Sequence, residues 1–282
     1  MAGGCPVVIE CVPNFSEGRD PLILAEIAAA IRETPDVRLF DTSADPDHHR
    51  SVFTFAGPPA AVIRAMQGAA RVAVERIDLR GHHGVHPRIG AVDVVPFVPV
   101  SGSTVKECAG LARSFGEWIS NEIGVPVFFY EPGRRLEEVR RMAREGAPPD
   151  LGEGRHPTAG ACAVGARDFL IAWNIWLETA DLDVARRIAR SIRFSSGGLP
   201  GVKALGLPLA SQGIVQVSIN STDFRATPLD VIYRHVRKLA GASGIAVRGS
   251  ELIGMIPSAA LEGASDLDWL NLSPERILPA VW

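Results

Sequence analysis

The stretch "FLIAWNIWLETADLDVARRIARSIR" (Phe169–Arg193) decides the fold, because a strand pattern in it passes directly into a helix pattern. Phe169–Glu178 predicts a strand and Leu182–Arg193 predicts a helix, since the spacing of the apolar residues changes between them. Downstream, the same kinds of pattern predict two strands, a helix and a strand at Lys203–Leu207, Ile214–Asn220, Pro228–Ala240 and Ile245–Ile256. We therefore expect the second half of the chain to fold in the order β-α-β-β-α-β.

The first half of the chain shows the same order of patterns. A strand, a helix, two strands, a helix and a strand are predicted at Val7–Val12, Pro21–Thr34, Val37–Asp41, Ser51–Phe55, Ala60–Arg76 and Ala91–Val100. An added helix and strand follow at Val105–Ile123 and Val127–Tyr130. Each half matches the split βαββαβ, or ferredoxin-like, motif. We expect an α+β fold of two ferredoxin-like subdomains, residues 1–166 and 167–282, whose bare sheet faces meet or enclose a cleft.

The composition is that of a globular protein and excludes several functional classes. The chain has 282 residues, a net charge of −3 and a pI near 6.2, so it lacks a basic footprint for nucleic acid or an anionic membrane. No window approaches ~18 consecutive apolar residues, and the first residues lack the basic start of a signal peptide. No C-x-x-C motif is present. We therefore expect a cytoplasmic protein with buried free thiols at Cys5, Cys11, Cys108 and Cys162.

Three histidines lie close together in "RGHHGVHPRIG" (Arg80–Gly90), directly before a predicted strand. His82 and His86 have the spacing of a helical metal-binding pair. The glycines and the proline around them disfavour a helix, however, and no third ligand occurs at a recognisable spacing, so we expect no metal. On composition alone a purely solvated loop is the favoured interpretation, and general acid–base chemistry by a histidine is the catalytic role that stays open beside it.

Two other segments are candidates for parts of a site. "DPDHHR" (Asp45–Arg50) joins two predicted strands, and the spacing does not tell whether it meets the histidine-rich loop. "APPDLGEGRHPTAGACAVGAR" (Ala147–Arg167) follows a predicted exposed helix at Pro132–Gly146 and is rich in glycine, proline and alanine. Such a composition is typical of a linker, but glycine also permits close approach of a flat ligand.

The chain is similar to the formiminotransferase family in the blocks "VIECVPNFSEGRD", "HHRSVFTFAGPP", "HHGVHPRIGAVDVVPFVPV", "GARDFLIAWNI" and "IVQVSINSTDF", from about Val7 to Pro257. This family is the folate-dependent glutamate formimidoyltransferase of histidine degradation and one-carbon metabolism, found alone or fused to a cyclodeaminase. The resemblance implies two ferredoxin-like subdomains packed around a substrate cleft. It also implies transfer of the formimino group of N-formimino-L-glutamate to N5 of tetrahydrofolate. The chain is expected to be the stand-alone form, being too short to carry the cyclodeaminase.

The resemblance implies roles for individual residues as well. The family's catalytic histidine is that of the His-Pro-Arg triplet, here His86, acting as general acid and base. The family usually has asparagine where this chain has His49, and the folate loop is one residue shorter than in the fused animal enzymes. Tetrahydrofolate is expected as a co-substrate, no metal is expected, and the family implies a homodimer. The folate-binding loop of the family falls here on Gly152, Glu153, Gly154, Arg155, His156, Pro157, Thr158, Ala159 and Gly160.

The chemistry of the implied reaction adds candidate substrate contacts. Guanidinium groups bind carboxylates with two parallel hydrogen bonds, which makes three arginines candidates for the substrate carboxylates. Carboxylates on or beside the first-half strands could hold the cationic amidine, although structural hydrogen bonding at strand ends explains them equally well. The candidates are Arg50, Arg88, Arg167, Glu10, Asp41, Asp93 and, for a polar contact, His49.

Three other functions are alternatives. A transferase of the same fold could use another donor, such as formiminoglycine, or the chain could bind folate without catalysis. An RNA-binding protein is disfavoured, because the predicted strands lack paired aromatic residues and the chain is slightly acidic. The expected partners are therefore small-molecule substrates, with no nucleic acid and no membrane.

Overall fold

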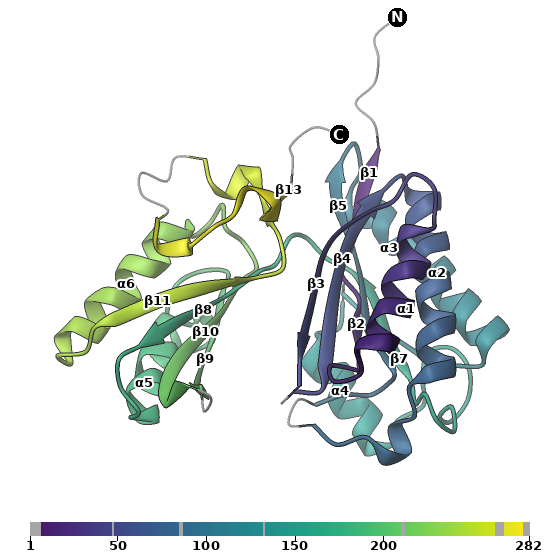
Figure 1. Cartoon of the computed structure of the whole chain (residues 1–282), viewed down its shortest axis with the longest axis horizontal. Helices are drawn as coiled ribbons and strands as arrows, with labels where there is room; N and C mark the ends of the chain where they lie inside the picture. Colours follow the sequence, from purple (N-terminus) through teal and green to yellow (C-terminus); the bar gives the residue numbers. More distant parts are fainter. Residues whose placement is uncertain are drawn as a thin grey trace, which may run out of the picture. The chain divides into compact units, whose positions relative to one another are not determined.

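The computed structural model describes residues 7–46, 48–84, 87–131, 133–209, 212–262 and 268–278 (Figure 1). Contacts divide the chain into two compact units, one running to Arg167 and one starting at Asp168. Both units combine helices with β-sheets, which confirms the predicted α+β class. Each unit has its own sheet and its own hydrophobic core.

The first unit is built on a seven-stranded sheet. Its strands are β1 (Val8–Cys11), β2 (Asn14–Phe15), β3 (Arg38–Asp45), β4 (Arg50–Gly57), β5 (Val92–Ser101), β6 (Val127–Tyr130) and β7 (Cys162–Ala166). Its helices are α1 (Pro21–Arg32), α2 (Pro59–Arg76), α3 (Val105–Trp118) and α4 (Leu136–Glu145), with a 3₁₀ turn η1 (Leu79–Gly81) and a π-helical turn η2 (Ile119–Ile123). The predicted order of strands and helices is present from β1 to β5, with β2 as a short addition.

Antiparallel pairing orders the central strands of this sheet. β4 lies between β3 and β1, and β1 lies between β4 and β5. β2 continues the path of β1 between the same two neighbours, after an interruption at Val12 and Pro13. Beyond β5, β7 pairs in parallel with both β5 and β6. The strands that carry Glu10 and Arg50 are therefore interior strands.

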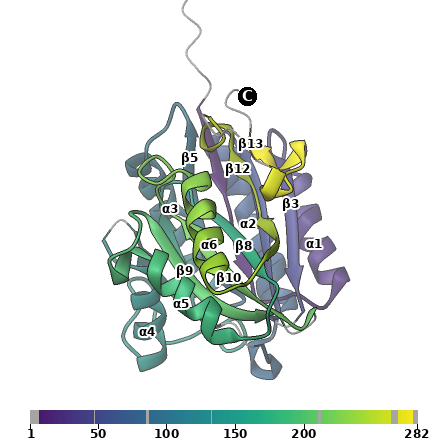
Figure 2. The ribbon, with the colours of Figure 1, turned by 90° about the vertical axis from the view of Figure 1, so that its left-hand side faces the viewer.

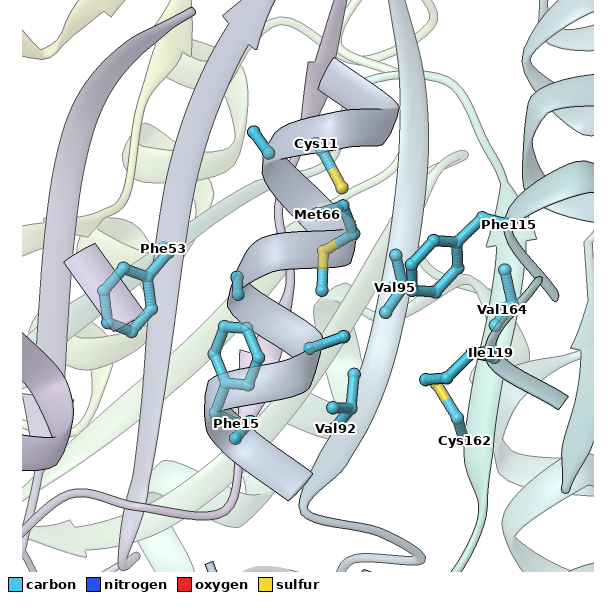
Figure 3. Packing of buried hydrophobic residues seen from close by; sticks show 14 of the residues in the cluster. Cys11, Phe15, Phe53, Met66, Val92, Val95, Phe115, Ile119, Cys162 and Val164 are labelled. Carbon is cyan, nitrogen blue, oxygen red and sulfur yellow. The ribbon is translucent and has the colours of Figure 1, made fainter. Parts of the chain in front are cut away.

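Helices α1, α2 and α3 pack on one face of the sheet and form the main core with it (Figure 1). Figure 3 shows Phe15 and Phe53 beside Met66 of α2, with the two phenyl rings edge to face at a centroid distance of 5.4 Å. The opposite face is covered near β6 and β7 by α4, whose Val139 and Ala143 form a second, smaller cluster. The α4 side of the sheet therefore has a separate environment from the main core.

Local signals fix where the helices of this unit begin. Pro21 occupies the first turn of α1, and the side chain of Asp20 accepts from the N–H of Leu22 at 2.8 Å. At α3, Thr104 and Glu107 form a reciprocal capping box. These caps satisfy N–H groups that would otherwise lack partners at the helix starts.

The segment between the two halves contains a strand that its composition does not predict. Cys162–Ala166 forms β7, inside the sheet between β5 and β6. All five of its residues are buried, so they show none of the alternation that marks a half-exposed strand. The interpretation of this segment as a linker is therefore wrong for Cys162–Ala166.

The second unit has a four-stranded antiparallel sheet in the order β11-β8-β10-β9, with α5 and α6 on one face (Figure 2). This unit follows the predicted order β-α-β-β-α-β, and its last strand has a register shift between Val247 and Gly249. Its main elements are β8 (Ile171–Leu177), α5 (Leu182–Ile192), β9 (Val202–Leu209), β10 (Ile214–Ser221), α6 (Leu229–Ala242) and β11 (Val247–Ile253). Its short elements are β12 (Ile256–Pro257) and β13 (Ile277–Leu278) and the 3₁₀ turns Phe194–Ser196, Ser258–Ala260, Asp268–Leu270 and Pro274–Arg276.

Candidate active site

The two histidine-bearing loops of the first unit lie side by side. One precedes β4 and the other precedes β5, and both strands pair antiparallel with β1, so they start at the same end of the sheet. The rings of His49 and His82 meet edge to face, with centroids 3.8 Å apart and planes at 82°. The structure therefore brings together two segments whose contact could not be predicted from their spacing.

Arg88 joins the same two loops through its guanidinium. Nη2 donates to the carbonyl oxygen of His48 at 2.9 Å, and Nη1 donates to that of His49 at 3.1 Å. Nη1 also lies 2.6 Å from Nδ1 and 2.9 Å from Nε2 of His82. A guanidinium has only donors, so the ring nitrogen that accepts from it carries no proton. Gly84 makes room for this contact, because a Cβ there would lie 2.5 Å from Nη2 of Arg88.

Asp93 is a fully buried carboxylate that also connects the two loops. One oxygen accepts from the N–H of Ile89 at 2.6 Å, and the other pairs with Arg50 and lies 3.3 Å from Nη2 of Arg140 on α4. Burial alone would raise the pKa of Asp93, but the two arginines and these hydrogen bonds outweigh it and lower the pKa. Arg50 also donates to Oδ1 of Asn14 at 3.0 and 2.7 Å. The start of β4, the loop before β5 and helix α4 thus share one polar network.

The imidazoles of His49 and His82 are held in the neutral form. Burial, together with the neighbouring Arg88 and His49, lowers the pKa of His82 to about 4. Burial also lowers the pKa of His49, whose Nε2 lies 3.7 Å from Oε1 of Glu17. At neutral pH both rings can accept or donate a hydrogen bond without carrying charge.

The predicted catalytic residue, His86, lies with Val85 outside the described residues. The chain is described on either side of it. A Cβ at Gly84 would lie 2.5 Å from the carbonyl oxygen of His48, and Arg88 donates to the same oxygen. His86 is therefore bracketed in sequence by residues that contact the other histidine-bearing loop.

Three candidate side chains share the sheet face opposite α1, α2 and α3. The residues before and after Glu10 point into the main core, so Glu10 points away from it. Asp41 pairs across the sheet with Thr54, whose two neighbours on β4 also point into the core. Arg50 lies four residues before Thr54 on the same strand and so projects from the same face. The structure thus places Glu10, Asp41 and Arg50 on one side of the first sheet.

Glu10 is buried in this face, with 4% of its surface exposed. Burial raises its pKa to about 7, although the charge of Arg167 opposes the change. Arg167 directly follows β7, and its backbone N–H donates to the carbonyl oxygen of Phe97 at 3.1 Å. A carboxyl group that titrates near neutral pH can hold or release a proton there, which is the behaviour required of an acid–base or cation-binding group.

Glu10→Gln is expected to stabilise the protein increasingly as the pH rises. The folded-state pKa of Glu10, about 7, lies above its ordinary value of 4.5, so the fold favours the protonated form. Stability associated with this group is complete below pH ~4.5 and is lost as the pH rises through 7. Denaturant unfolding should therefore show a gain for the variant that is roughly 2–3 kcal/mol larger at pH 8 than at pH 5. An equal gain at both pH values would contradict the burial of an ionisable carboxyl at this position.

The predicted folate loop is an ordered part of the first unit and runs against the histidine-rich loop. The N–H of Leu79 donates to the carbonyl oxygen of Thr158, and the N–H of Ala91 donates to that of Ala159, both at 2.9 Å. Within the loop, Nδ1 of His156 accepts from the N–H of Ala159 at 3.0 Å. These hydrogen bonds contradict the interpretation of the segment as a plain linker.

The glycines of this loop differ in the space around them. Gly160, with φ +71°, packs so closely that a Cβ would lie 2.4 Å from the carbonyl oxygen of Ile89. A Cβ on Gly152, with φ +77°, would lie 3.0 Å from Oγ of Ser120. Gly154, with φ +61°, has no atom within 4 Å of such a Cβ. Gly160 is therefore needed for packing, whereas the space at Gly154 is open to a ligand.

Three further residues of the loop are exposed, two of them charged. Glu153, Arg155 and Pro157 are exposed, and Arg155 donates to the carbonyl oxygen of Ala143 on α4. This contact anchors the loop to α4 on the side of the sheet that carries Asp93 and Arg140.

Sequence reasoning missed three residues of the polar network. Asn14 and Glu17 lie in a segment whose composition indicates only a turn, and Arg140 is one of several arginines on α4. Oε1 of Glu17 accepts from three successive backbone N–H groups, those of residues 18 to 20, at 2.7–2.9 Å. A helix rich in arginine, with its buried side turned to a sheet, is the signal that could have identified Arg140.

The described cysteines are structural. Cys11, Cys108 and Cys162 are free and buried, as expected, while Cys5 lies outside the described residues. Burial raises the pKa of Cys11 and Cys162, which keeps these thiols protonated and poorly nucleophilic.

The part of the chain that the structure describes contains neither a cluster of metal ligands nor a membrane-spanning helix. There, no three or more histidine, cysteine, aspartate or glutamate side chains are grouped so as to hold a metal ion. No helix there has the length and apolar character that crossing a bilayer requires.

Comparison with known proteins agrees with these features. The N-terminal subdomain of the formiminotransferase domain matches residues 8–167, and the formiminotransferase domain matches residues 172–269. The chain belongs to the formiminotransferase family. The two matched regions of this formiminotransferase meet where its two compact units separate.

Relatives of this formiminotransferase match it over most of its length. Glutamate formimidoyltransferase of Streptococcus pyogenes serotype M1 is 40% identical over 270 residues, 90% of each chain. The protein of the same name from Thermoplasma acidophilum is 38% identical, covering 90% of this chain and 89% of its own. Formimidoyltransferase-cyclodeaminase of Gallus gallus is 40% identical over 92% of this chain and 52% of its own. A solved microcompartment protein of Desulfitobacterium hafniense aligns at 12% identity over 87% of this chain and 93% of its own with a TM-score of 0.24, which is too weak a likeness to inform the fold.

Proposed function

We propose that this formiminotransferase is a glutamate formimidoyltransferase. It transfers the formimino group of N-formimino-L-glutamate to N5 of tetrahydrofolate, giving 5-formiminotetrahydrofolate and glutamate. The observation that carries the proposal is that three loops of the first unit lie next to one another. The His-Pro-Arg loop, the second histidine-bearing loop and the glycine-rich loop, far apart in sequence, adjoin one another through the contacts of Arg88, Leu79 and Ala91. Relatives named for this activity, at about 40% identity, support it.

The reaction exchanges one carbon–nitrogen bond for another. N5 of tetrahydrofolate attacks the formimino carbon, and a tetrahedral centre forms. The bond from that carbon to the glutamate nitrogen then breaks. N5 loses a proton and the leaving nitrogen gains one, so a single residue that accepts the first proton can supply the second. We assign this role to His86. No electrons are gained or lost, so the step requires no redox partner.

Glu10 and Asp41 are assigned to the cationic amidine. Both carboxylates project from the sheet face opposite the main core, and Glu10 titrates near neutral pH. A negative charge there would keep the amidine protonated, and the protonated amidine is the form that N5 attacks most readily. His49, with its neutral ring, is assigned to a polar contact with the substrate, and Arg167 is assigned to a substrate carboxylate.

Gly154→Leu is expected to weaken tetrahydrofolate binding by tenfold or more, about 1.4 kcal/mol. We assign Gly152–Gly160 to folate, and a side chain at Gly154 would fill the open space that a flat ring can occupy. Gly244→Leu is the matched control, since Gly244 has φ +69° and equally open surroundings in the second unit. Titration of both variants with tetrahydrofolate measures the effect. Equal affinities would show that the loop does not bind folate.

The family resemblance further leads us to propose a cytoplasmic homodimer. Light scattering at micromolar concentration should give twice the mass of the chain, and a monomer mass would contradict this.

The choice of donor is tested by steady-state kinetics with N-formimino-L-glutamate and formiminoglycine. The two share one carboxylate and differ in the side chain, so only the first can use a second carboxylate contact. We expect a higher kcat/KM for formiminoglutamate. A higher kcat/KM for formiminoglycine would overturn the glutamate assignment and leave a transferase of the same fold with another donor.

A further inference from the structure

We propose that Arg88 is a positioning residue that fixes the segment carrying His86, rather than a substrate-binding arginine. This inference rests on the proposed function. Arg88 stands two residues after His86, and its guanidinium donates to main-chain oxygens of the neighbouring loop at His48 and His49. It also contacts the ring of His82, four residues before His86. The chain is thus held on both sides of His86 by one side chain.

The guanidinium suits this task because it presents five donors in a rigid plane. Two carbonyl oxygens and one imidazole nitrogen are among the groups that accept from it, and these three carry no negative charge. A residue built to bind a substrate carboxylate would direct paired N–H groups at an open space instead. Lysine has the charge but a single nitrogen, so it cannot span the same three acceptors.

Gly84 supports the same conclusion from the opposite side of the contact. Its ideal Cβ would lie 2.5 Å from Nη2 of Arg88 and 2.5 Å from the carbonyl oxygen of His48. Any side chain at this position would push the guanidinium away from its acceptors. The sequence therefore places glycine where the arginine needs close approach to the main chain.

The substitution Arg88→Lys separates the two roles. If Arg88 positions His86, kcat should fall by roughly 10²-fold, the cost of misplacing a reacting group, while KM for formiminoglutamate changes by less than about twofold. The matched control is Arg80→Lys, because Arg80 lies in the same loop and its exposed side chain pairs with Asp78. It should retain wild-type kinetics. Arg88→Ala should regain part of its kcat when methylguanidinium is added.

A KM raised by roughly tenfold or more with kcat retained would overturn the proposal and return Arg88 to the substrate carboxylates. Should Arg88→Lys fail to fold, Gly84→Ala carries the test, and it must lower kcat with KM kept. An increase in KM alone for Gly84→Ala would equally contradict the positioning role. Absence of transfer in the wild-type protein would instead contradict the proposed function, so the two failures are distinguishable.

Discussion

Replacing His86 by alanine is expected to lower the turnover number for formimino transfer by roughly 10²–10⁴-fold, with tetrahydrofolate affinity nearly unchanged. The variant lacks the group assigned to carry a proton from N5 to the leaving nitrogen. Two imidazoles of the adjoining loops, His49 and His82, have lowered pKa values and are already committed to contacts within the protein. They are therefore poor substitutes for a residue that must gain and lose a proton in each cycle.

His83→Ala is the matched control, because His83 lies in the same loop and is exposed. Single-turnover measurements should show the loss in the chemical step for His86→Ala and a normal rate for His83→Ala. A wild-type rate in His86→Ala would contradict the assignment of His86 as the proton carrier. A loss of equal size in both variants would instead indicate that the loop as a whole has been disturbed.

Replacing Asp93 by asparagine is expected to destabilise the protein by on the order of 3–5 kcal/mol. The carboxylate is fully buried and pairs with Arg50 and Arg140, so its neutralisation leaves two buried guanidinium groups without their counter-charge. Because its pKa is lowered, Asp93 contributes stability that is present above pH ~4 and is lost as the pH falls through its folded-state pKa. Denaturant unfolding at pH 7 measures the loss, and the loss should shrink in acid.

Asp183→Asn provides the comparison for this prediction. Asp183 is 73% exposed and pairs with Arg186 one turn away on a helix surface, so its removal should cost at most about 1 kcal/mol. If Asp93→Asn cost no more than Asp183→Asn, the network of Asp93, Arg50 and Arg140 would not be a stabilising part of the fold.

Most of the fold could be predicted from apolar patterns, because its strands and helices bury one face each. The order of elements in both halves follows from spacing alone, and capping residues such as Thr104 mark the helix starts. β7 escaped prediction because it is buried on both faces and is built from small residues. β3 runs on to Asp45, beyond the predicted end at Asp41, because pairing with β4 extends a polar strand that its own residues do not indicate.

The residue types of the candidate site could be predicted from the sequence, but the contacts between them could not. Resemblance indicates His86 and the glycine-rich loop, while the roles of Arg88 and Asp93 depend on contacts across 39 and 43 residues of sequence. For His49, the structure explains a residue that differs from the one the resemblance implies. It has φ +49°, a left-handed conformation in which histidine and asparagine are both enriched, so the replacement of the family's usual asparagine is compatible with the same backbone.

The most direct test of the account follows the formimino carbon itself. N-formimino-L-glutamate labelled with ¹³C at that carbon is incubated with the purified protein and tetrahydrofolate, and the products are followed by NMR. The account predicts that the label appears on tetrahydrofolate as 5-formiminotetrahydrofolate, with one glutamate released for each label transferred. Binding of tetrahydrofolate with the label remaining on glutamate would contradict the account and identify a folate-binding protein without catalysis.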